Sequence, residues 1–351
     1  MTRAKLIATC LAPITGAGVC SAAASPPTAD ITNGVVHVRL YLPDAQTGFY
    51  RGTRFDWAGA IFSLKFAGHD YFPQWFQRSD PNVRDFVYEG GDIVAGPCTA
   101  MTGPAEEFVN DGGALGFNEA KPGGRFVKIG VGVLQKPDDA KYEMFRLYPI
   151  LDPGKRAIRQ APDSIEFTQE LSDPATGYAY LYRKRVLLSP GKPRMVLEHS
   201  LRNTGKHAIH SSVYDHNFLY LDHHAPGAGT SITVPFTIQA SPPPDERLAS
   251  IEGNRILFRK TLAGEDRVYF TVSGFGPDAK DYDVRIENAQ AGAGVHITGD
   301  RPLSRAALWS IRAPLSFEPF IDVNVEPGAE FTWRITYDFY ALPVGSNDSR
   351  Q

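Results

Sequence analysis

The chain is best interpreted from the segment His210-Ser211-Ser212-Val213-Tyr214-Asp215-His216-Asn217-Phe218-Leu219-Tyr220-Leu221-Asp222. β-Branched and aromatic residues fill this segment without a Gly or Pro, which favours a β-strand. Because side chains alternate between the two faces of a strand, Tyr214, His216, Phe218 and Tyr220 share one face. A histidine among aromatic rings can face a ring-shaped ligand, and its usual pKa of about 6.5 suits proton transfer near neutral pH. The alternative is a core histidine whose ring nitrogens bond to backbone groups.

The same alternation of apolar and polar residues extends over most of the chain. It begins near Val35, and the 33 glycines and 27 prolines lie mostly between the alternating runs, as turn residues do. No long stretch has the 3.6-residue apolar repeat of a helix, and no change of composition marks a linker. Many short strands separated by turns predict an all-β fold, with one large antiparallel domain over residues 31–342. Further runs of this kind lie at residues 61–66, 165–171, 180–188, 195–201, 213–221, 256–262, 268–272, 284–286, 295–298 and 331–340.

Residues 1–24 have the pattern of a secretory signal peptide. Arg3 and Lys5 precede a mostly apolar run, and Ala22-Ala23-Ala24 before Ser25 fits a cleavage site. The alternative is a disordered or anchored N-terminus. We therefore expect a periplasmic or secreted protein in which residues 25–30 are a flexible lead-in and residues 343–351 a disordered tail.

Composition excludes several classes of partner. The net charge of the chain is −3 and its basic residues are scattered, which argues against a nucleic-acid-binding surface. Cys10 and Cys20 would leave with the signal peptide, so Cys98 cannot form an internal disulfide, and no CxxC spacing suggests zinc. No other apolar run is long enough to span a membrane. We expect no metal, no organic cofactor, no nucleic acid and no membrane span.

Residues 50–59 form a first candidate binding segment. They contain two arginines, an aspartate and a tryptophan, which is an unusual density for the entry to a β-strand. Arg54 and Trp57 are the candidate ligand-binding residues. The alternative is that the arginines and the aspartate simply pair with each other.

Residues 103–126 form a second candidate segment, rich in glycine, acids, amide and basic residues. The segment does not match a phosphate-binding loop, because no GxxxxGK[ST] pattern occurs. We interpret it as a long loop across the mouth of a cleft, since loops of more than about 12–15 residues are usually functional or disordered. Glu107, Asn118 and Arg125 are its candidate binding residues.

Residues 309–328 form a third candidate segment. Glu318 lies between Phe317 and Pro319, and burial there would raise its pKa and suit it to proton transfer. The alternative is an exposed acid at the end of a strand. Trp309 is a candidate for stacking on a ligand.

Three segments together carry a resemblance to a known family. Asp215–Leu221 is similar to the setting of a central histidine, and Phe317-Glu318-Pro319 before Glu326-Pro327-Gly328 is similar to that of a catalytic glutamate. Residues 57–64 and 68–71 resemble an opening strand pair. In this order the segments resemble the galactose mutarotase-like, or aldose 1-epimerase-like, family, as a divergent secreted bacterial-type member.

The resemblance implies a fold and a chemistry. The family folds as a large antiparallel β-sandwich, the galactose mutarotase-like supersandwich, with a saddle-shaped sugar cleft. In that family's chemistry Glu318 would take the proton of the anomeric hydroxyl, and His216 would donate a proton to the ring oxygen. The ring opens and closes as the other anomer, and no cofactor is needed.

The chain departs from the family pattern at two places. The family's second histidine has no counterpart, because residues 115–120 contain none. The family's substrate arginine could correspond to Arg54 or Arg125. The missing histidine allows a variant in which His216 and a nearby tyrosine act on a different sugar derivative, for example in an elimination.

We therefore expect a carbohydrate-active protein of the aldose 1-epimerase type. The alternatives are a non-catalytic carbohydrate-binding protein, a sugar-directed lyase on the same fold, and an unrelated role on a similar fold. In a binding protein Trp57, Trp75, Tyr214 and Trp309 would stack on sugar rings. The expected partner is a small-molecule sugar or oligosaccharide, and the expected state is a monomer or weak homo-oligomer.

We predict that the mature protein begins near Ser25, because cleavage after the alanine triplet removes residues 1–24. N-terminal sequencing of the exported protein measures this directly. Exported protein that retains Met1 would contradict the prediction.

Overall fold

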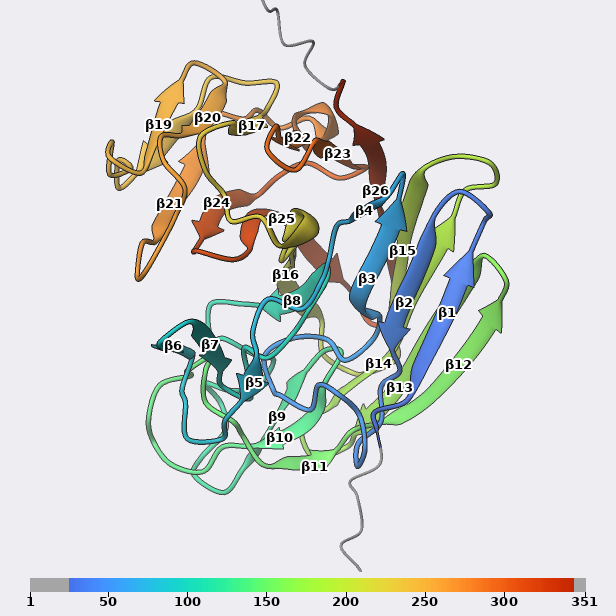
Figure 1. Cartoon of the computed structure of the whole chain (residues 1–351). Coiled ribbons are helices and arrows are strands. Elements are labelled where there is room, and N and C mark those ends of the chain that lie inside the picture. Colours follow the sequence, from blue (N-terminus) through green and yellow to red (C-terminus); the bar gives the residue numbers. More distant parts are fainter. Residues whose placement is uncertain (1–24, 344–351) are drawn as a thin grey trace, which may run out of the picture.

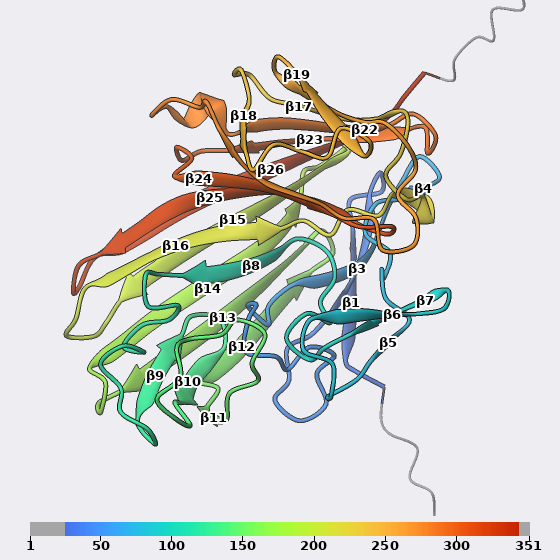
Figure 2. The ribbon, with the colours of Figure 1, turned by 90° about the vertical axis from the view of Figure 1, so that its left-hand side faces the viewer.

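The computed structural model describes residues 25–343, which form a nearly all-β fold (Figure 1 and Figure 2). The helical elements in this range are two short 3-10 turns, η1 (Leu221–His223) and η2 (Ala279–Asp281), and neither could span a membrane. The expected all-β antiparallel fold is confirmed. The expected signal peptide and residues 344–351 of the expected tail lie outside the described residues.

The largest sheet has ten antiparallel strands. The three long strands β13, β14 and β15 lie toward one end, and β26 joins them to the other half. In order across the sheet, the strands are β12 (Lys155–Ala161), β13 (Ser164–Asp173), β14 (Tyr178–Leu188), β15 (Arg194–Asn203), β26 (Glu330–Ala341), β23 (Ala293–Gly299), β22 (Asp283–Asn288), β17 (Thr230–Thr233), β20 (Arg255–Phe258) and β19 (Ala249–Glu252).

A second sheet of six antiparallel strands packs on the ten-stranded one. Figure 2 shows its strands β25, β16 and β8 lying side by side above the long strands of the larger sheet. In order across the sheet, the strands are β18 (Gln239–Ser241), β21 (Val268–Ser273), β24 (Arg305–Ser310), β25 (Leu315–Val325), β16 (Ile209–His216) and β8 (Ala105–Val109).

Three small sheets complete the described part of the chain. The first contains β1 (Thr28–Thr32), β2 (His37–Tyr41), β3 (Ala60–Phe66) and β4 (His69–Asp70). The others contain β11 (Ile150–Asp152), β10 (Gly132–Gln135) and β9 (Arg125–Lys128), and β5 (Arg78–Ser79), β7 (Asp92–Ala95) and β6 (Phe86–Glu89). Because β1 pairs with β2 from Thr28 onward, part of the expected flexible lead-in belongs to a strand.

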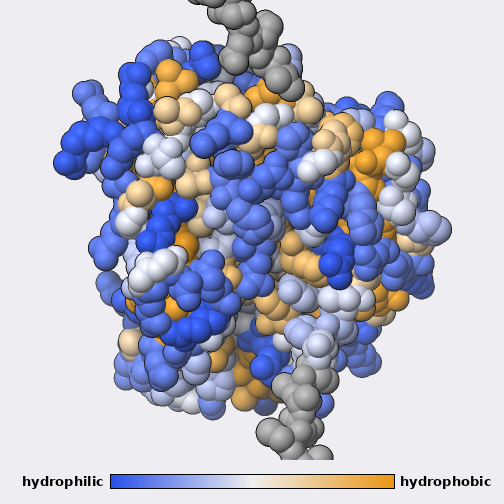
Figure 3. All heavy atoms as spheres, in the orientation of Figure 1, coloured by the Kyte–Doolittle hydropathy of each residue, from blue (hydrophilic) through white to orange (hydrophobic). Residues whose placement is uncertain are grey.

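The core lies between the two large sheets. Because side chains alternate between the two faces of a strand, those of Val213 on β16 and Ile321 on β25 point inward. There they join Leu197 of β15 and Ile335 of β26 in one apolar cluster. On the outer face drawn in Figure 3, hydrophilic residues predominate and hydrophobic ones form only small patches. The alternating pattern is therefore explained by burial on one face of each strand.

A charged cluster is buried in this inter-sheet layer. Glu106 of β8 accepts hydrogen bonds from Lys184 of β14 and, at 2.8 Å, from Nε2 of His199 on β15 when that nitrogen carries the proton. Lys184 also donates to the carbonyl oxygen of Ala58 at 3.0 Å. Burial opposes the charge on Glu106, but the ammonium of Lys184 and His199 hold its pKa at about 2. The cluster links the two sheets through complementary charges.

We predict that Lys184→Met destabilises the fold by about 3–5 kcal/mol, because it leaves the Glu106 carboxylate buried without its cation. Urea unfolding of the full chain measures the change. Arg183→Met is the matched control, since Arg183 is the exposed neighbour on the same strand and its loss should cost about 0.5 kcal/mol or less. Equal stabilities of the two variants would contradict the prediction.

Candidate functional site

Strand register gathers the candidate residues on the outer face of the six-stranded sheet. Ala307 of β24 lies opposite Glu318 of β25, and Ala105 of β8 lies opposite His216 of β16. In the next row Arg305 lies opposite Phe320, Phe320 opposite Tyr214, and Tyr214 opposite Glu107. Residues far apart in sequence therefore meet because each occupies an outward position of its strand.

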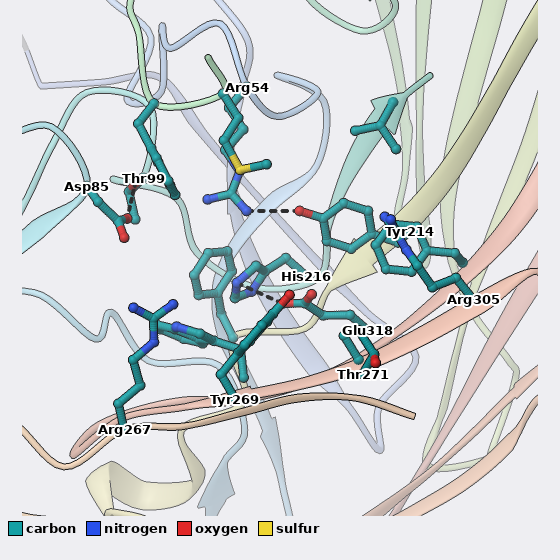
Figure 4. A pocket seen from close by; sticks show the side chains of 17 residues that line it. Arg54, Asp85, Thr99, Tyr214, His216, Arg267, Tyr269, Thr271, Arg305 and Glu318 are labelled. Carbon is teal, nitrogen blue, oxygen red and sulfur yellow. Dashed lines mark hydrogen bonds and ion pairs between the residues drawn. The ribbon is translucent and has the colours of Figure 1, made fainter. Parts of the chain in front are cut away.

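A pocket of about 400 Å³ lies on this face (Figure 4). This volume is within the range of about 300–1,000 Å³ that is usual for small-molecule sites. Loops before β3, around β6 and β7, and before β11 cover the face and contribute part of the wall. The lining residues are Arg54, Asp85, Thr99, Val109, Met144, Phe145, Tyr214, His216, Phe218, Arg267, Tyr269, Thr271, Arg305, Ala307, Trp309, Glu318 and Phe320.

His216 and Glu318 are in contact at the floor of the pocket. Nε2 of His216 lies 3.2 Å from Oε1 of Glu318, and the two residues are only 4% and 7% exposed. Burial raises the pKa of Glu318 to about 8. Burial and, secondly, the nearby charge of Arg54 lower the pKa of His216 well below its usual value. At neutral pH the two groups are therefore a neutral imidazole and a protonated carboxyl.

Aromatic rings explain why water is largely excluded from this histidine. Phe218 stacks on the His216 ring at 3.8 Å between centroids, and Trp309 and Phe55 approach it edge-on at 5.0 and 5.7 Å. Nδ1 of His216 has no hydrogen-bond partner among residues 25–343. The alternative of a core histidine satisfied by backbone groups is therefore wrong.

The strand that carries His216 is shorter than expected. β16 ends at His216, and Phe218 adopts a φ of 46°, in the left-handed region that a bulky side chain rarely occupies. Tyr220 lies beyond this turn and does not line the pocket. The turn places the Phe218 ring against the His216 ring. In a continuous strand the Phe218 ring would lie farther from His216.

Arg54 enters the pocket from the opposite wall and is held by two partners. Its Nε donates to Oε2 of Glu107 at 2.7 Å, and its Nη2 donates to the Tyr214 hydroxyl at 2.9 Å. The Tyr214 hydroxyl in turn donates to Oε2 of Glu107 at 2.6 Å. Lys128 lies 3.3 Å from Oε1 of Glu107. Glu107 is fully buried behind Arg54, so it positions the guanidinium rather than facing the cavity.

The structure brings most, but not all, of the expected site residues together. His216, Glu318, Arg54, Tyr214 and Trp309 line the pocket, with Glu107 directly behind. The other three expected residues lie elsewhere, and each has a different environment.

Trp57 is a core residue, 2% exposed, whose indole donates to the carbonyl oxygen of Gly52 at 2.8 Å. Arg125 pairs with Asp173 at 3.1 Å beside a separate surface groove, and Asn118 is exposed and does not line the pocket. Trp75 is also buried in the core. The segment 103–126 is not one loop over a cleft, because its first part forms β8 within the sheet.

Several pocket residues were not expected from the sequence. Asp85 accepts a hydrogen bond from the Thr99 hydroxyl at 2.8 Å, and burial raises its pKa. Arg267, Tyr269 and Arg305 stand at the rim. Arg267 lies just before β21, Tyr269 on β21 and Arg305 on β24, and each of them is followed by a buried residue. This pattern points to the site only once these strands are known to neighbour the strand of Glu318.

Comparisons with known proteins agree on the fold. No family model and no curated protein sequence matches this chain. Among solved structures, an Escherichia coli K12 protein provisionally named an aldose 1-epimerase matches with a TM-score of 0.53 and 12% identity, over 90% of this chain and 99% of its own.

Two further solved structures are similar to the same extent. The Slr1438 protein of Synechocystis sp. PCC 6803 matches with a TM-score of 0.51 and 12% identity, over 91% of this chain and 97% of its own. The GalM/aldose epimerase homologue of C. elegans matches with a TM-score of 0.50 and 12% identity, over 91% of this chain and 100% of its own. At such identities the likeness concerns architecture, and the chain therefore has the galactose mutarotase-like fold.

Proposed function

We propose that this protein is a carbohydrate-active enzyme of the aldose 1-epimerase type, which interconverts the anomers of a sugar by acid–base catalysis. The observation that carries the proposal is the 3.2 Å contact between His216 and Glu318 inside a pocket of sugar-sized volume. The pKa of Glu318 is raised and that of His216 is lowered. At neutral pH the pair therefore contains one acid, the Glu318 carboxyl, and one base, the His216 imidazole, as this reaction requires. We further propose that the enzyme acts in the periplasm or outside the cell, which the signal-like residues 1–24 support.

The proposed reaction needs only proton transfers. In the neutral arrangement of the pair, His216 accepts the proton of the anomeric hydroxyl while the Glu318 carboxyl donates its proton to the ring oxygen. The bond between the anomeric carbon and the ring oxygen breaks, and an open-chain aldehyde forms beside an imidazolium and a carboxylate. Rotation about the adjacent carbon–carbon bond and reversal of both transfers give the other anomer and restore the pair.

These roles are the reverse of those that the family resemblance implies. The neutral pair and the imidazolium–carboxylate pair contain the same number of protons, so both could in principle start the reaction. Burial favours the neutral pair, because a separated charge is costly where little water can solvate it. Arg54 lies across the pocket, where its guanidinium can hydrogen-bond to sugar hydroxyls.

We predict that His216→Gln and Glu318→Gln each lower the rate of anomer interconversion by about 10²–10⁴-fold, because each removes one proton-transfer group. The double variant should cost little more than the worse single variant, since the two groups act as a unit. NMR of freshly dissolved aldoses, followed as the anomers approach equilibrium, measures the rate. His210→Gln on the same strand and Glu326→Gln after β25 are matched controls, because both residues are exposed.

The pH dependence of the interconversion rate distinguishes catalysis by His216 and Glu318 from catalysis by other ionisable groups. Activity should fall above about pH 8 as Glu318 loses its proton, and this decline should be absent from the residual activity of Glu318→Gln. Folded single variants that keep the wild-type rate would contradict the proposal. A wild-type protein that binds sugars without interconverting them would instead favour a carbohydrate-binding protein.

A further inference from the structure

The pocket has a charge that a neutral sugar does not require. Arg54, Arg267 and Arg305 line it, against Asp85 and Glu318. Because burial raises the pKa of Glu318 to about 8, its carboxyl is protonated at neutral pH. The wall then carries three guanidinium groups, of which Arg54 is neutralised by Glu107 behind it, and at most one carboxylate, that of Asp85, although the chain as a whole has a net charge of −3. The excess of positive charge is local to the pocket.

The two rim arginines are positioned by aromatic rings and not by acids. The guanidinium carbon of Arg305 lies 3.7 Å from the Phe320 ring centroid, and that of Arg267 lies 5.7 Å from the Tyr269 centroid. Among residues 25–343 neither guanidinium forms an ion pair or a hydrogen bond, so their donors are available to a ligand. Arg54 differs, because Glu107 already neutralises it.

The rim arginines flank the catalytic pair. Figure 4 shows Arg267 and Arg305 on opposite sides of His216 and Glu318. Arg305 occupies the row next to Glu318 on the adjacent strand, because Ala307 is directly opposite Glu318. A ligand that contacts His216 and Glu318 therefore lies within reach of one arginine or the other, and a guanidinium binds carboxylate or phosphate oxygens in a forked geometry.

We propose that the pocket selects sugars that carry an anionic group, a carboxylate or a phosphate, and that Arg267 and Arg305 bind this group. The inference rests on the proposed function, since it assumes that a sugar occupies the pocket. It assigns the substrate class that the missing second histidine left open: an acidic sugar, not a neutral aldose.

The experiment measures affinity and anomer interconversion for matched sugars. Glucuronate, galacturonate and glucose 6-phosphate are compared with glucose and galactose by calorimetry and NMR. We expect at least one anionic sugar to bind about tenfold or more tightly than its neutral counterpart, with an advantage that shrinks as salt is added. Comparison of the uronates with the phosphate identifies which anion the site prefers.

Variants test the assigned residues. Arg267→Gln and Arg305→Gln should reduce the ratio of anionic to neutral affinity, and the double variant should abolish the preference. Arg202→Gln, an exposed arginine on β15, should leave the ratio unchanged. Neutral and anionic sugars that bind and interconvert equally would overturn the inference while the proposed function stands. A preference that survives the double variant would also overturn it, and no binding or interconversion of any of the five sugars would overturn both.

Discussion

The site depends on one constraint: a histidine and a glutamate are held in contact where little water reaches them. The backbone pairing of β16 with β25 brings the two residues together, and aromatic rings around His216 exclude solvent. The same burial that raises the pKa of Glu318 and lowers that of His216 creates an acid and a base from two groups that would otherwise both be charged below neutral pH. This arrangement has a cost, because a buried carboxyl that must stay protonated opposes folding at neutral and alkaline pH.

Strand alternation separates this chemistry from the structural charges of the core. On β8, Glu106 points inward to Lys184 and His199, and its neighbour Glu107 points outward to Arg54. On β16, Asp215 points inward and His216 outward in the same way, and burial raises the pKa of Asp215 well above its usual value. A shift of one residue in the register of either strand would exchange the two sets of groups. The buried cluster and the pocket therefore depend on the same pairing.

The sequence predicts those parts of the site that local alternation controls. Alternation along one strand indicated that Tyr214 and His216 share a face, and the apolar neighbours of Glu318 indicated that it is buried. That Glu318 lies on the same sheet face, in contact with His216, follows only from the pairing of β16 with β25. Trp57, Asn118 and Arg125 were misplaced, because the path of the chain through residues 50–59 and 103–126 depends on long-range pairing. β8 pairs with β16, about 100 residues away, and Trp57 faces Arg156 in the core instead of a ligand. A buried residue at the next position marks Arg267 and Arg305 only as exposed, which is common for arginine, and only the order β21-β24-β25 places them beside Glu318.

The protonation of Glu318 in the folded protein is measured by the free energy of unfolding of the wild type and of Glu318→Gln, determined with urea across pH. Between about pH 4.5 and about pH 8 the unfolded chain loses the Glu318 proton while the folded chain keeps it. The wild type should therefore lose about 1.4 kcal/mol of stability per pH unit relative to Glu318→Gln in this window, and the difference should level off above it. Taking the difference between the two proteins removes the contributions of the ionisable groups that do not contact Glu318. A difference that does not change with pH, or that shifts toward the wild type as pH rises, would show that Glu318 is ionised in the folded protein and would contradict the account.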